Sequence, residues 1–397
     1  MKKGNIFHDF VIIIFFSINS IFLPFGLYFS HIFSLISFFY IVKWSKGSLF
    51  FLLVIIVLFI LYSFPVLMNN NVRISDYIVG FTILFLSIVF SVYIYLYIAY
   101  RLNDFHTLIS IIIKINFSIS VISSILFIFG QGTSLWTDSG SYGVNRLQLF
   151  FYEPSIYSLV SSIFVIYAVT NFLKLKNKES FYLLMLSIFP LFLSKSFGVM
   201  SAIALSIILG DIKNIAISLS SFKTWALGLI LILTLIFMAD SLIERFESAL
   251  QGQDNSGMVR VVYSLLSAIE LVKDEGVLLG VGPGQLKYVI GKYTAEHVGF
   301  GASERLPNSV ASTIATVGIL GFSLKLIILI GLFYFTRSYK FSYSRCIFIF
   351  IFIYQFTGGY FNNLNEFVPI AFSFGYAKYL QRKNGCLYRV VRYENNS

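Results

Sequence analysis

Residues 48–67 read SLFFLLVIIVLFILYSFPVL, a run that holds no charged side chain. About 20 apolar residues in a helix are enough to cross the hydrocarbon core of a bilayer. Because backbone groups in lipid must hydrogen-bond within their own segment, this run predicts a membrane-spanning helix. The same criterion selects about twelve spans along the chain, and the predicted fold is an all-α polytopic membrane protein. The spans are 8–23, 25–42, 48–67, 77–99, 105–130, 155–173, 180–194, 197–210, 222–239, 319–336, 346–361 and 364–380.

The composition supports the same fold class. Of the 397 residues, 57% are hydrophobic and 12% are charged, whereas soluble domains carry roughly 25% charged residues. The net charge of +11 comes from short clusters between apolar runs, which argues against nucleic acid as a partner. The two cysteines, Cys346 and Cys386, offer neither a disulfide framework nor metal-ligand spacing. We therefore expect no metal and no cofactor.

Lysine and arginine recur on alternate connections between the predicted spans. Cytoplasmic loops of membrane proteins retain these residues, so the alternation predicts the orientation of the chain. The basic connections carry Lys43, Lys46, Arg101, Lys174, Lys176, Lys178, Lys213, Lys223, Arg337, Lys340, Arg345, Arg382, Lys383, Arg389 and Arg392. This pattern predicts that both termini lie in the cytoplasm. The richness in Ile, Phe, Tyr, Lys, Asn and Ser is typical of an AT-rich bacterial gene, so the expected location is the bacterial inner membrane.

Four parts of the chain follow from the spans and the loops between them. They are an N-terminal transmembrane bundle at 1–239, a periplasmic cap loop at 240–318, C-terminal transmembrane helices at 319–380 and a cytoplasmic basic tail at 381–397. The first part contains a polar outer loop at 131–154. Loops longer than about 15 residues are usually functional or disordered, so both outer segments are candidates for function.

The cap loop is predicted to contain helices. Residues 258–273 place Val259, Val262, Leu265, Leu266, Ile269 and Val272 on one helical face. The sequence GVGPG at 280–284 breaks the helix, 285–293 forms a second one, and 308–317 forms a third that Gly318 and Gly321 separate from the next span. These segments predict an amphipathic cap on the outer membrane surface.

Several cations fall on the outer side, against the charge rule: Arg73, Arg146, Lys195, Arg245, Arg260, Lys287, Lys292 and Arg305. Ion pairs with nearby carboxylates are the expected explanation for Arg245 and Lys292. Three of them, Arg146, Lys195 and Arg260, lie close to predicted helix ends near the membrane. A guanidinium group binds phosphate through two parallel hydrogen bonds. From the residues alone, ion pairing and a diphosphate site remain equal alternatives for these three.

Two further features leave alternatives open. Glu153 begins a predicted span ahead of Pro154, and its carboxylate is either a general base or a partner of the helix dipole. The GVGPG loop at 280–284 lacks the spacing of a dinucleotide-binding or Walker motif, which favours a hinge over a phosphate loop. His297 is the one histidine predicted to lie outside, where a loop histidine is usually solvated.

The order of these motifs resembles the bacterial O-antigen polymerase and ligase superfamily. The motifs are Arg146, then EPS at 153–155, LSKS at 193–196, Arg260, LLGVGPGQ at 278–285, Pro307 with Asn308, and GILG at 318–321. The resemblance in layout covers nearly the whole chain. Its specific motifs lie in the two outer loops and in the pair of short spans, 180–194 and 197–210, between them. It implies a fold like that of the C-type glycosyltransferases, which act on undecaprenyl-diphosphate-linked sugars.

The resemblance also implies roles for individual residues. Arg146 and Arg260 match the arginines that hold the donor diphosphate, and Lys195 stands where the family often has arginine. Gly282, Gly284, Arg305 and Asn308 complete the expected substrate-binding set. Where the family's ligases carry a histidine, this chain has Pro307, which favours polymerase over ligase.

The expected function is therefore an O-antigen polymerase that acts on the periplasmic face. It would transfer an undecaprenyl-diphosphate-linked glycan en bloc onto the non-reducing end of another lipid-linked repeat unit, with inversion and without metal. Glu153 is the first candidate for the base and His297 the second. Expected partners are the lipid-linked oligosaccharides, membrane lipids and a chain-length regulator protein. The alternatives are a ligase and a flippase, and a flippase predicts functional charges inside spans and an internal repeat.

Overall fold

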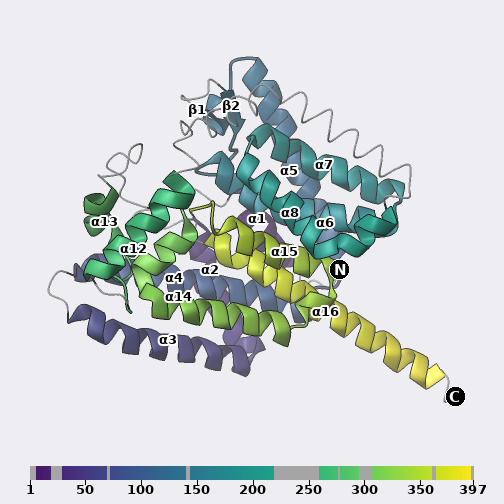
Figure 1. Ribbon diagram of the computed structural model, residues 1–397. Helices are drawn as coiled ribbons and strands as arrows, with labels where there is room; N and C mark the ends of the chain where they lie inside the picture. The colour runs from purple at the N-terminus through teal and green to yellow at the C-terminus, as the bar shows by residue number, and fades with distance from the viewer. Residues whose placement is uncertain are drawn as a thin grey trace.

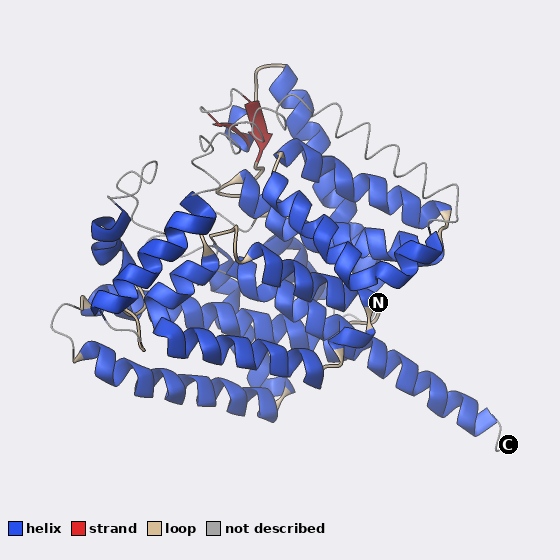
Figure 2. Ribbon diagram, in the orientation of Figure 1, coloured by secondary structure: helices blue, strands red, loops and turns tan. Residues whose placement is uncertain are grey.

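The computed structural model describes residues 6–18, 29–68, 72–139, 144–218, 259–275, 278–294, 306–359 and 364–394. These residues are almost entirely helical (Figure 1, Figure 2). Among them, 6 helices are long and apolar enough to cross a membrane. They are α3 (Lys46–Leu67), α4 (Ile74–Leu96) with the π-helical turn η2 (Tyr97–Arg101) that continues it, α5 (Phe105–Ile128), α6 (Pro154–Leu175), α8 (Phe197–Ser218) and α14 (Ser309–Phe335).

The remaining elements are shorter or less apolar. They are α1 (Ile6–Ser17), α2 (Phe29–Trp44), η3 (Thr133–Leu135), β1 (Trp136–Ser139), β2 (Val144–Leu147), α7 (Lys178–Ser194), η4 (Val259–Tyr263), α12 (Ser264–Glu275), α13 (Leu286–Thr294), η5 (Ser338–Lys340), α15 (Ser342–Tyr354) and α16 (Leu364–Glu394). The helical, membrane-spanning class is thus confirmed. The count of twelve spans is not, and the span expected at 222–239 lies outside the described residues.

The bundle has two distinct ends. Figure 1 shows α12 and α13 at its left, which we call the cap end, and the last turns of α16 projecting to the lower right, which we call the tail end. Helix α6 lies in the interior, with 83% of its spanning window buried, whereas only 11% of the α3 window is buried. Small side chains such as Ser158 and Ser162 let neighbouring helices approach α6 closely.

A two-stranded hairpin occupies the outer loop at 131–154, where only a polar loop was expected. Strands β1 and β2 are antiparallel, with Thr137 opposite Arg146. The Trp136 indole N–H donates to Ser123 Oγ at 3.0 Å, which ties the hairpin to α5. The hairpin fixes Arg146 on a strand and not at a helix end, because strand pairing satisfies the backbone of this polar segment.

Helix α14 bends sharply where the sequence predicted a break. Gly318 has φ 69° and ψ −177°, a conformation that is almost restricted to glycine. A Cβ atom at this position would collide with the carbonyl group of Leu278. The bend separates a first half that packs on α12 from a second half that spans the bundle, and the predicted helix at 308–317 is confirmed.

The apolar face predicted for residues 258–273 is divided between exposed and buried positions. Val262, Leu266 and Ile269 are 37%, 43% and 45% exposed. The buried face instead carries Ser264, Ser267, Ala268, Leu271 and Val272. Small residues on this face meet Ala311 and Ala315 of α14. The buried face is the one whose small side chains allow α12 and α14 to pack closely. A search for apolar side chains at helical spacing does not detect small residues of this kind.

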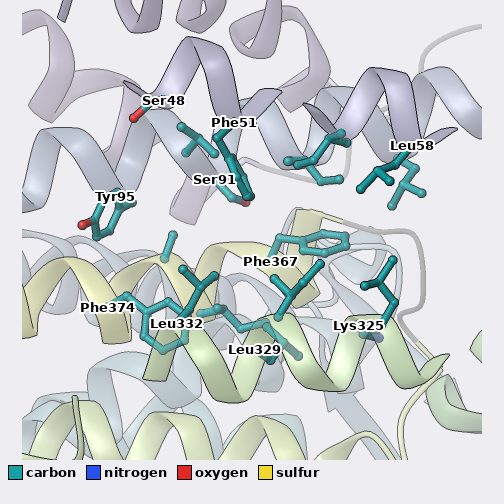
Figure 3. A pocket seen from close by; sticks show the side chains of 18 of the residues that line it. Ser48, Phe51, Leu58, Ser91, Tyr95, Lys325, Leu329, Leu332, Phe367 and Phe374 are labelled. Carbon is teal, nitrogen blue, oxygen red and sulfur yellow. The ribbon is translucent and has the colours of Figure 1, made fainter. Parts of the chain in front are cut away.

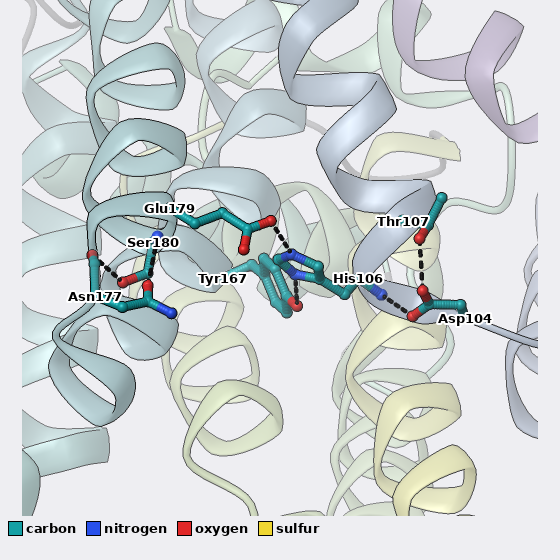
Figure 4. Close-up of polar contacts among 7 residues, drawn as sticks. All are labelled: Asp104, His106, Thr107, Tyr167, Asn177, Glu179 and Ser180. Atoms are coloured by element: carbon teal, nitrogen blue, oxygen red, sulfur yellow. Dashed lines mark hydrogen bonds and ion pairs between the residues drawn. The ribbon is translucent and has the colours of Figure 1, made fainter.

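At the tail end, polar contacts hold the ends of three helices together (Figure 4). The Asp104 carboxylate accepts from the His106 backbone N–H at 3.0 Å and caps α5. The His106 ring contacts the Tyr167 hydroxyl of α6 at 2.8 Å and the Glu179 carboxylate of α7 at 3.4 Å. Asn177 caps α7 by accepting from the Ser180 N–H at 2.8 Å. These polar side chains therefore have a structural role, which is to connect the ends of α5, α6 and α7.

Candidate functional site

Two of the expected cations lie next to each other at the cap end. The Arg146 Nε–H on β2 donates to the carbonyl oxygen of Ser194 at 3.0 Å. Lys195 follows directly and adopts the left-handed conformation, with φ 48°, that ends α7. Partial burial, together with the positive charge of Arg146, lowers the pKa of the Lys195 ammonium. The sequence-distant cations are therefore neighbours, as the diphosphate interpretation requires.

One buried side chain, that of Tyr354 at the end of α15, lies within electrostatic range of several candidate residues. This side chain interacts electrostatically with Arg260, Glu153 and Arg146. Gly198, in the first turn of α8, lies against the same ring, since a Cβ built on it would be 4.0 Å from Tyr354 Cε2. Sequence reasoning missed Tyr354. The signal available was weak, because a tyrosine that ends an apolar span is also typical of a membrane interface.

Glu153 lies immediately before α6 in an extended conformation, with φ −142° and ψ 149°. Pro154 occupies the first turn of the helix, as predicted. The Glu153 carboxylate accepts a hydrogen bond from Ser155 Oγ at 2.9 Å and is partly buried. Its position at a helix N-terminus agrees with the dipole interpretation, and its charge acts on the Tyr354 side chain. Its role as a base stays a prediction.

Arg260 lies in the π-helical turn that precedes α12, as the sequence predicted for a residue at the start of a helix. Its guanidinium Nη1 donates to the Thr357 carbonyl oxygen at 3.3 Å. Its own carbonyl oxygen accepts from Asn308 Nδ2 at 2.8 Å. Arg260 is thus held at both ends, by the backbone after α15 and by the start of α14.

Asn308 was expected to bind substrate, and its side chain is engaged within the protein. The residue is fully buried at the N-terminus of α14. Its Nδ2 donates to the carbonyl oxygens of Arg260 and Phe356, and its Oδ1 accepts from the Ala311 N–H at 3.0 Å. With these groups engaged and no exposed surface, Asn308 is a positioning residue for Arg260.

Gly282 and Gly284 were also expected to bind substrate, and the geometry favours the hinge instead. The Gly282 N–H donates to the Thr316 carbonyl oxygen at 2.8 Å, so it is engaged within the protein. A Cβ on Gly282 would meet Val66 and Tyr77, and one on Gly284 would collide with the Asp76 backbone. Positive φ angles of 94° and 74° explain why glycine is needed at both. The loop packs α14 against α3 and α4.

Other predicted cations have local partners or fall outside the described residues. Lys292 lies 3.8 Å from the Asp274 carboxylate, which confirms the ion pair expected for a cap lysine. Lys287 pairs with Asp76 at 2.8 Å, a carboxylate the sequence had not suggested. Arg73 stacks on the Tyr288 ring at 3.9 Å. Arg305, Arg245 and His297 lie outside the described residues.

Sequence reasoning missed a charge pair within the spans. Lys325 of α14 forms an ion pair with Glu366 of α16, whose side chain is fully buried. The Lys325 ammonium also donates to Thr313 Oγ1 at 3.4 Å. Charges inside spans are rare and often functional. Both residues sit in predicted spans, so a search for charged residues within 319–336 and 364–380 would have found them.

The candidate site combines three cations with a carboxylate. Arg146, Lys195 and Arg260 carry three positive charges and Glu153 one negative charge, a net charge of +2 from these four residues. Such an arrangement suits a dianionic or trianionic group and places a proton acceptor close to it. Within the described ranges, no group of three or more His, Cys, Asp and Glu side chains is arranged to hold a metal ion. Comparison of the chain with protein-family models, with curated protein sequences and with solved structures found no match.

Proposed function

We propose that this protein is an O-antigen polymerase of the inner membrane. It transfers an undecaprenyl-diphosphate-linked glycan en bloc onto the non-reducing end of a second lipid-linked repeat unit at the periplasmic face. The observation that supports this most directly is that Arg146, Glu153 and Arg260, from separate segments, all act electrostatically on one buried side chain, that of Tyr354. Lys195 adds a third cation beside Arg146.

In the proposed reaction, an acceptor hydroxyl oxygen attacks the anomeric carbon of the donor glycan. The bond from that carbon to the diphosphate oxygen breaks, the configuration inverts, and the diphosphate leaves with the bonding electrons. Arg146, Arg260 and Lys195 stabilise the charge that develops on the leaving diphosphate, an effect that is worth about 10²–10³ in rate per donor in other enzymes. The Glu153 carboxylate accepts the hydroxyl proton.

The surroundings of the site suit a lipid-linked donor. The phosphates need a polar boundary, and the polyprenyl tail needs an apolar surface next to it. Phe352 and Phe356 are 47% and 38% exposed at the end of α15, next to Thr357, whose carbonyl oxygen accepts from Arg260. A diphosphate held by Arg260 therefore has an apolar surface beside it for the first units of its tail.

Gene deletion separates this proposal from its rivals. Loss of a polymerase leaves lipid A core bearing one repeat unit on a lipopolysaccharide gel. Loss of a ligase, or of a flippase with no substitute, leaves core without any repeat unit. The polymerase proposal is rejected if the deletion strain shows unmodified core or a normal ladder.

A matched pair of variants tests the site itself. Arg260→Ala is expected to abolish long chains while the protein stays inserted and abundant on an immunoblot. Lys292→Ala is the control, because that cation is 73% exposed and pairs with Asp274. Normal ladders from Arg260→Ala, or equal loss from both variants, would contradict a specific role for the Arg260 guanidinium.

One observation favours a transporter as a second candidate. The Lys325–Glu366 pair places opposite charges inside the bundle, which is where transporters hold their coupling groups. Pro307 stands where the resembled ligases carry histidine, and the ligase gains no comparable support.

A further inference from the structure

A cavity of about 1260 Å³ lies between α3, α4, α14 and α16 (Figure 3). Its lining is mainly aliphatic and aromatic, with Phe51 and Leu58 on one side and Leu329, Phe367 and Phe374 on the other. Small-molecule sites usually measure about 300–1,000 Å³, so this space is large for a soluble ligand. The four charged residues of the candidate site, Arg146, Glu153, Lys195 and Arg260, do not line this cavity. The cavity is a separate feature.

Helix α3 forms one wall of the cavity and packs on the bundle through Leu52, which is fully buried, and Phe59, whose ring centroid lies 4.6 Å from that of Phe81. Near the cap end, the Tyr62 hydroxyl donates to the Leu279 carbonyl oxygen at 2.6 Å, and Ser63 contacts the Tyr77 hydroxyl at 2.6 Å. At the tail end, α3 follows directly from α2. The stretch from Ser48 to Tyr62 lines the space between, and at 1.5 Å per residue it is about 21 Å long. An acyl chain of one leaflet, about half of a 30 Å core, fits that length.

The two ends of the cavity differ in charge. Lys325 lines the end nearer the cap, where its ammonium is neutralised by Glu366. The other end is lined by Trp44, Ser48, Tyr95 and Arg101, and the Arg101 guanidinium lies 5.5 Å from the Trp44 ring. In Figure 3 the hydroxyl groups of Ser48 and Tyr95 lie at the end opposite Lys325. A guanidinium group beside an indole ring therefore marks the tail end of the cavity.

We infer that this cavity binds an anionic phospholipid of the cytoplasmic leaflet. Its acyl chains lie between α3 and the α14–α16 wall, and its phosphate meets the Arg101 guanidinium beside Trp44. A guanidinium binds phosphate through paired hydrogen bonds, tryptophan and tyrosine prefer the headgroup level, and basic pockets between spans bind anionic headgroups. The exposed Lys43 and Lys46, next to Trp44 in sequence, add to the positive field. The inference is independent of the proposed polymerase activity.

Tryptophan fluorescence tests the inference in the full-length protein. The chain has three tryptophans, so Trp136→Phe with Trp225→Phe leaves Trp44 as the reporter at the cavity mouth. The protein is reconstituted in phosphatidylcholine vesicles in which an equal mole fraction is replaced by brominated phosphatidylglycerol or brominated phosphatidylcholine. Bromine quenches the indole on contact. The expected result is relative binding about five- to tenfold in favour of phosphatidylglycerol, from about 1 kcal/mol per basic group near the surface.

Three variants decide the outcome. Arg101→Gln is expected to remove the preference for phosphatidylglycerol and Arg101→Lys to keep most of it, while Lys213→Gln, on α8 and away from the cavity, has no effect. Ser91→Leu, which fills the space from α4, lowers quenching by both lipids and reports on the cavity if Arg101→Gln does not fold. Equal quenching by both lipids, or an unchanged preference in Arg101→Gln, would overturn the inference. So would displacement of brominated phosphatidylglycerol by a small mole fraction of polyprenyl phosphate, since that result assigns the cavity to the carrier.

Discussion

The ion pair between Lys325 and Glu366 leads to a graded stability prediction. The Glu366 side chain is 0% exposed, and neither of its oxygens has a hydrogen-bond partner among the described residues apart from this ion contact. The Lys325 side chain is 15% exposed, faces the cavity and has a second contact with Thr313. Loss of the ion pair should therefore destabilise the protein more when the Glu366 carboxylate is left alone than when the Lys325 ammonium is.

Lys325→Met leaves a fully buried carboxylate without compensation, which costs about 3–5 kcal/mol in other proteins. Glu366→Met costs less, because the lysine keeps Thr313 and can turn its ammonium toward the cavity. The double variant replaces both charges by apolar groups of similar volume, a change that is often neutral or stabilising by about 1–4 kcal/mol. The expected order of stability places Lys325→Met lowest, Glu366→Met next, and the double variant close to the natural protein.

Unfolding of the four purified proteins in mixed detergent micelles measures this order. The double-variant cycle should return a coupling of at least about 2 kcal/mol. A double variant as unstable as Lys325→Met would refute the reasoning, since the pair would then not be self-compensating. The same variant separates the two candidate functions: normal chain ladders mean that the pair is structural, whereas a stable variant that leaves core without any repeat unit would support transport.

Three further changes give expected outcomes. Asn308→Ala removes the α14 cap and leaves two carbonyl oxygens unsatisfied, so unfolding should be easier by about 3 kcal/mol and polymer length should fall even in the protein that remains folded. Because the pKa of Lys195 is lowered, its charge is lost as pH rises before an ordinary lysine titrates. Polymerisation in vesicles should therefore decline on the alkaline side, and Lys195→Arg should extend activity to higher pH. Gly318→Ala should cost at least about 1–3 kcal/mol from its φ of 69°, with reduced abundance on an immunoblot, whereas Gly331→Ala, with open space around it, should be neutral.

Local signals in the sequence were enough to predict the helical segments. The uncharged run at 48–67 became α3, and glycine at 318 became the bend in α14, because each depends on residues within one segment. The start of α6 followed from Pro154 in the same way. In these cases the hydrophobicity and the backbone conformation depend on residues of one segment, so they can be predicted from a single sequence.

The features that the sequence did not reveal depend on partners distant in the chain. The buried face of α12 was set by Ala311 and Ala315, and the role of Asn308 by the carbonyl oxygen of Arg260. The hinge favoured for the loop with Gly282 and Gly284 could be inferred from the sequence, but its contacts with α3 and α4 could not. Tertiary contacts of this kind produce no periodic pattern in the sequence. The cations Arg146, Lys195 and Arg260 could therefore be identified from the sequence, whereas the residues that contact them could not.

The central claim is that Arg146, Lys195 and Arg260 form one diphosphate site, and direct binding tests it. Native mass spectrometry of the purified protein with undecaprenyl diphosphate and undecaprenyl phosphate compares the two ligands, with Arg146→Ala, Arg260→Ala and Glu153→Gln as variants. Each charge-assisted bond is worth about 1.5–3 kcal/mol, so each arginine variant should bind the diphosphate at least about tenfold more weakly. Glu153→Gln should bind it normally and fail to polymerise. Equal binding of the diphosphate by the natural protein and both arginine variants would contradict the account.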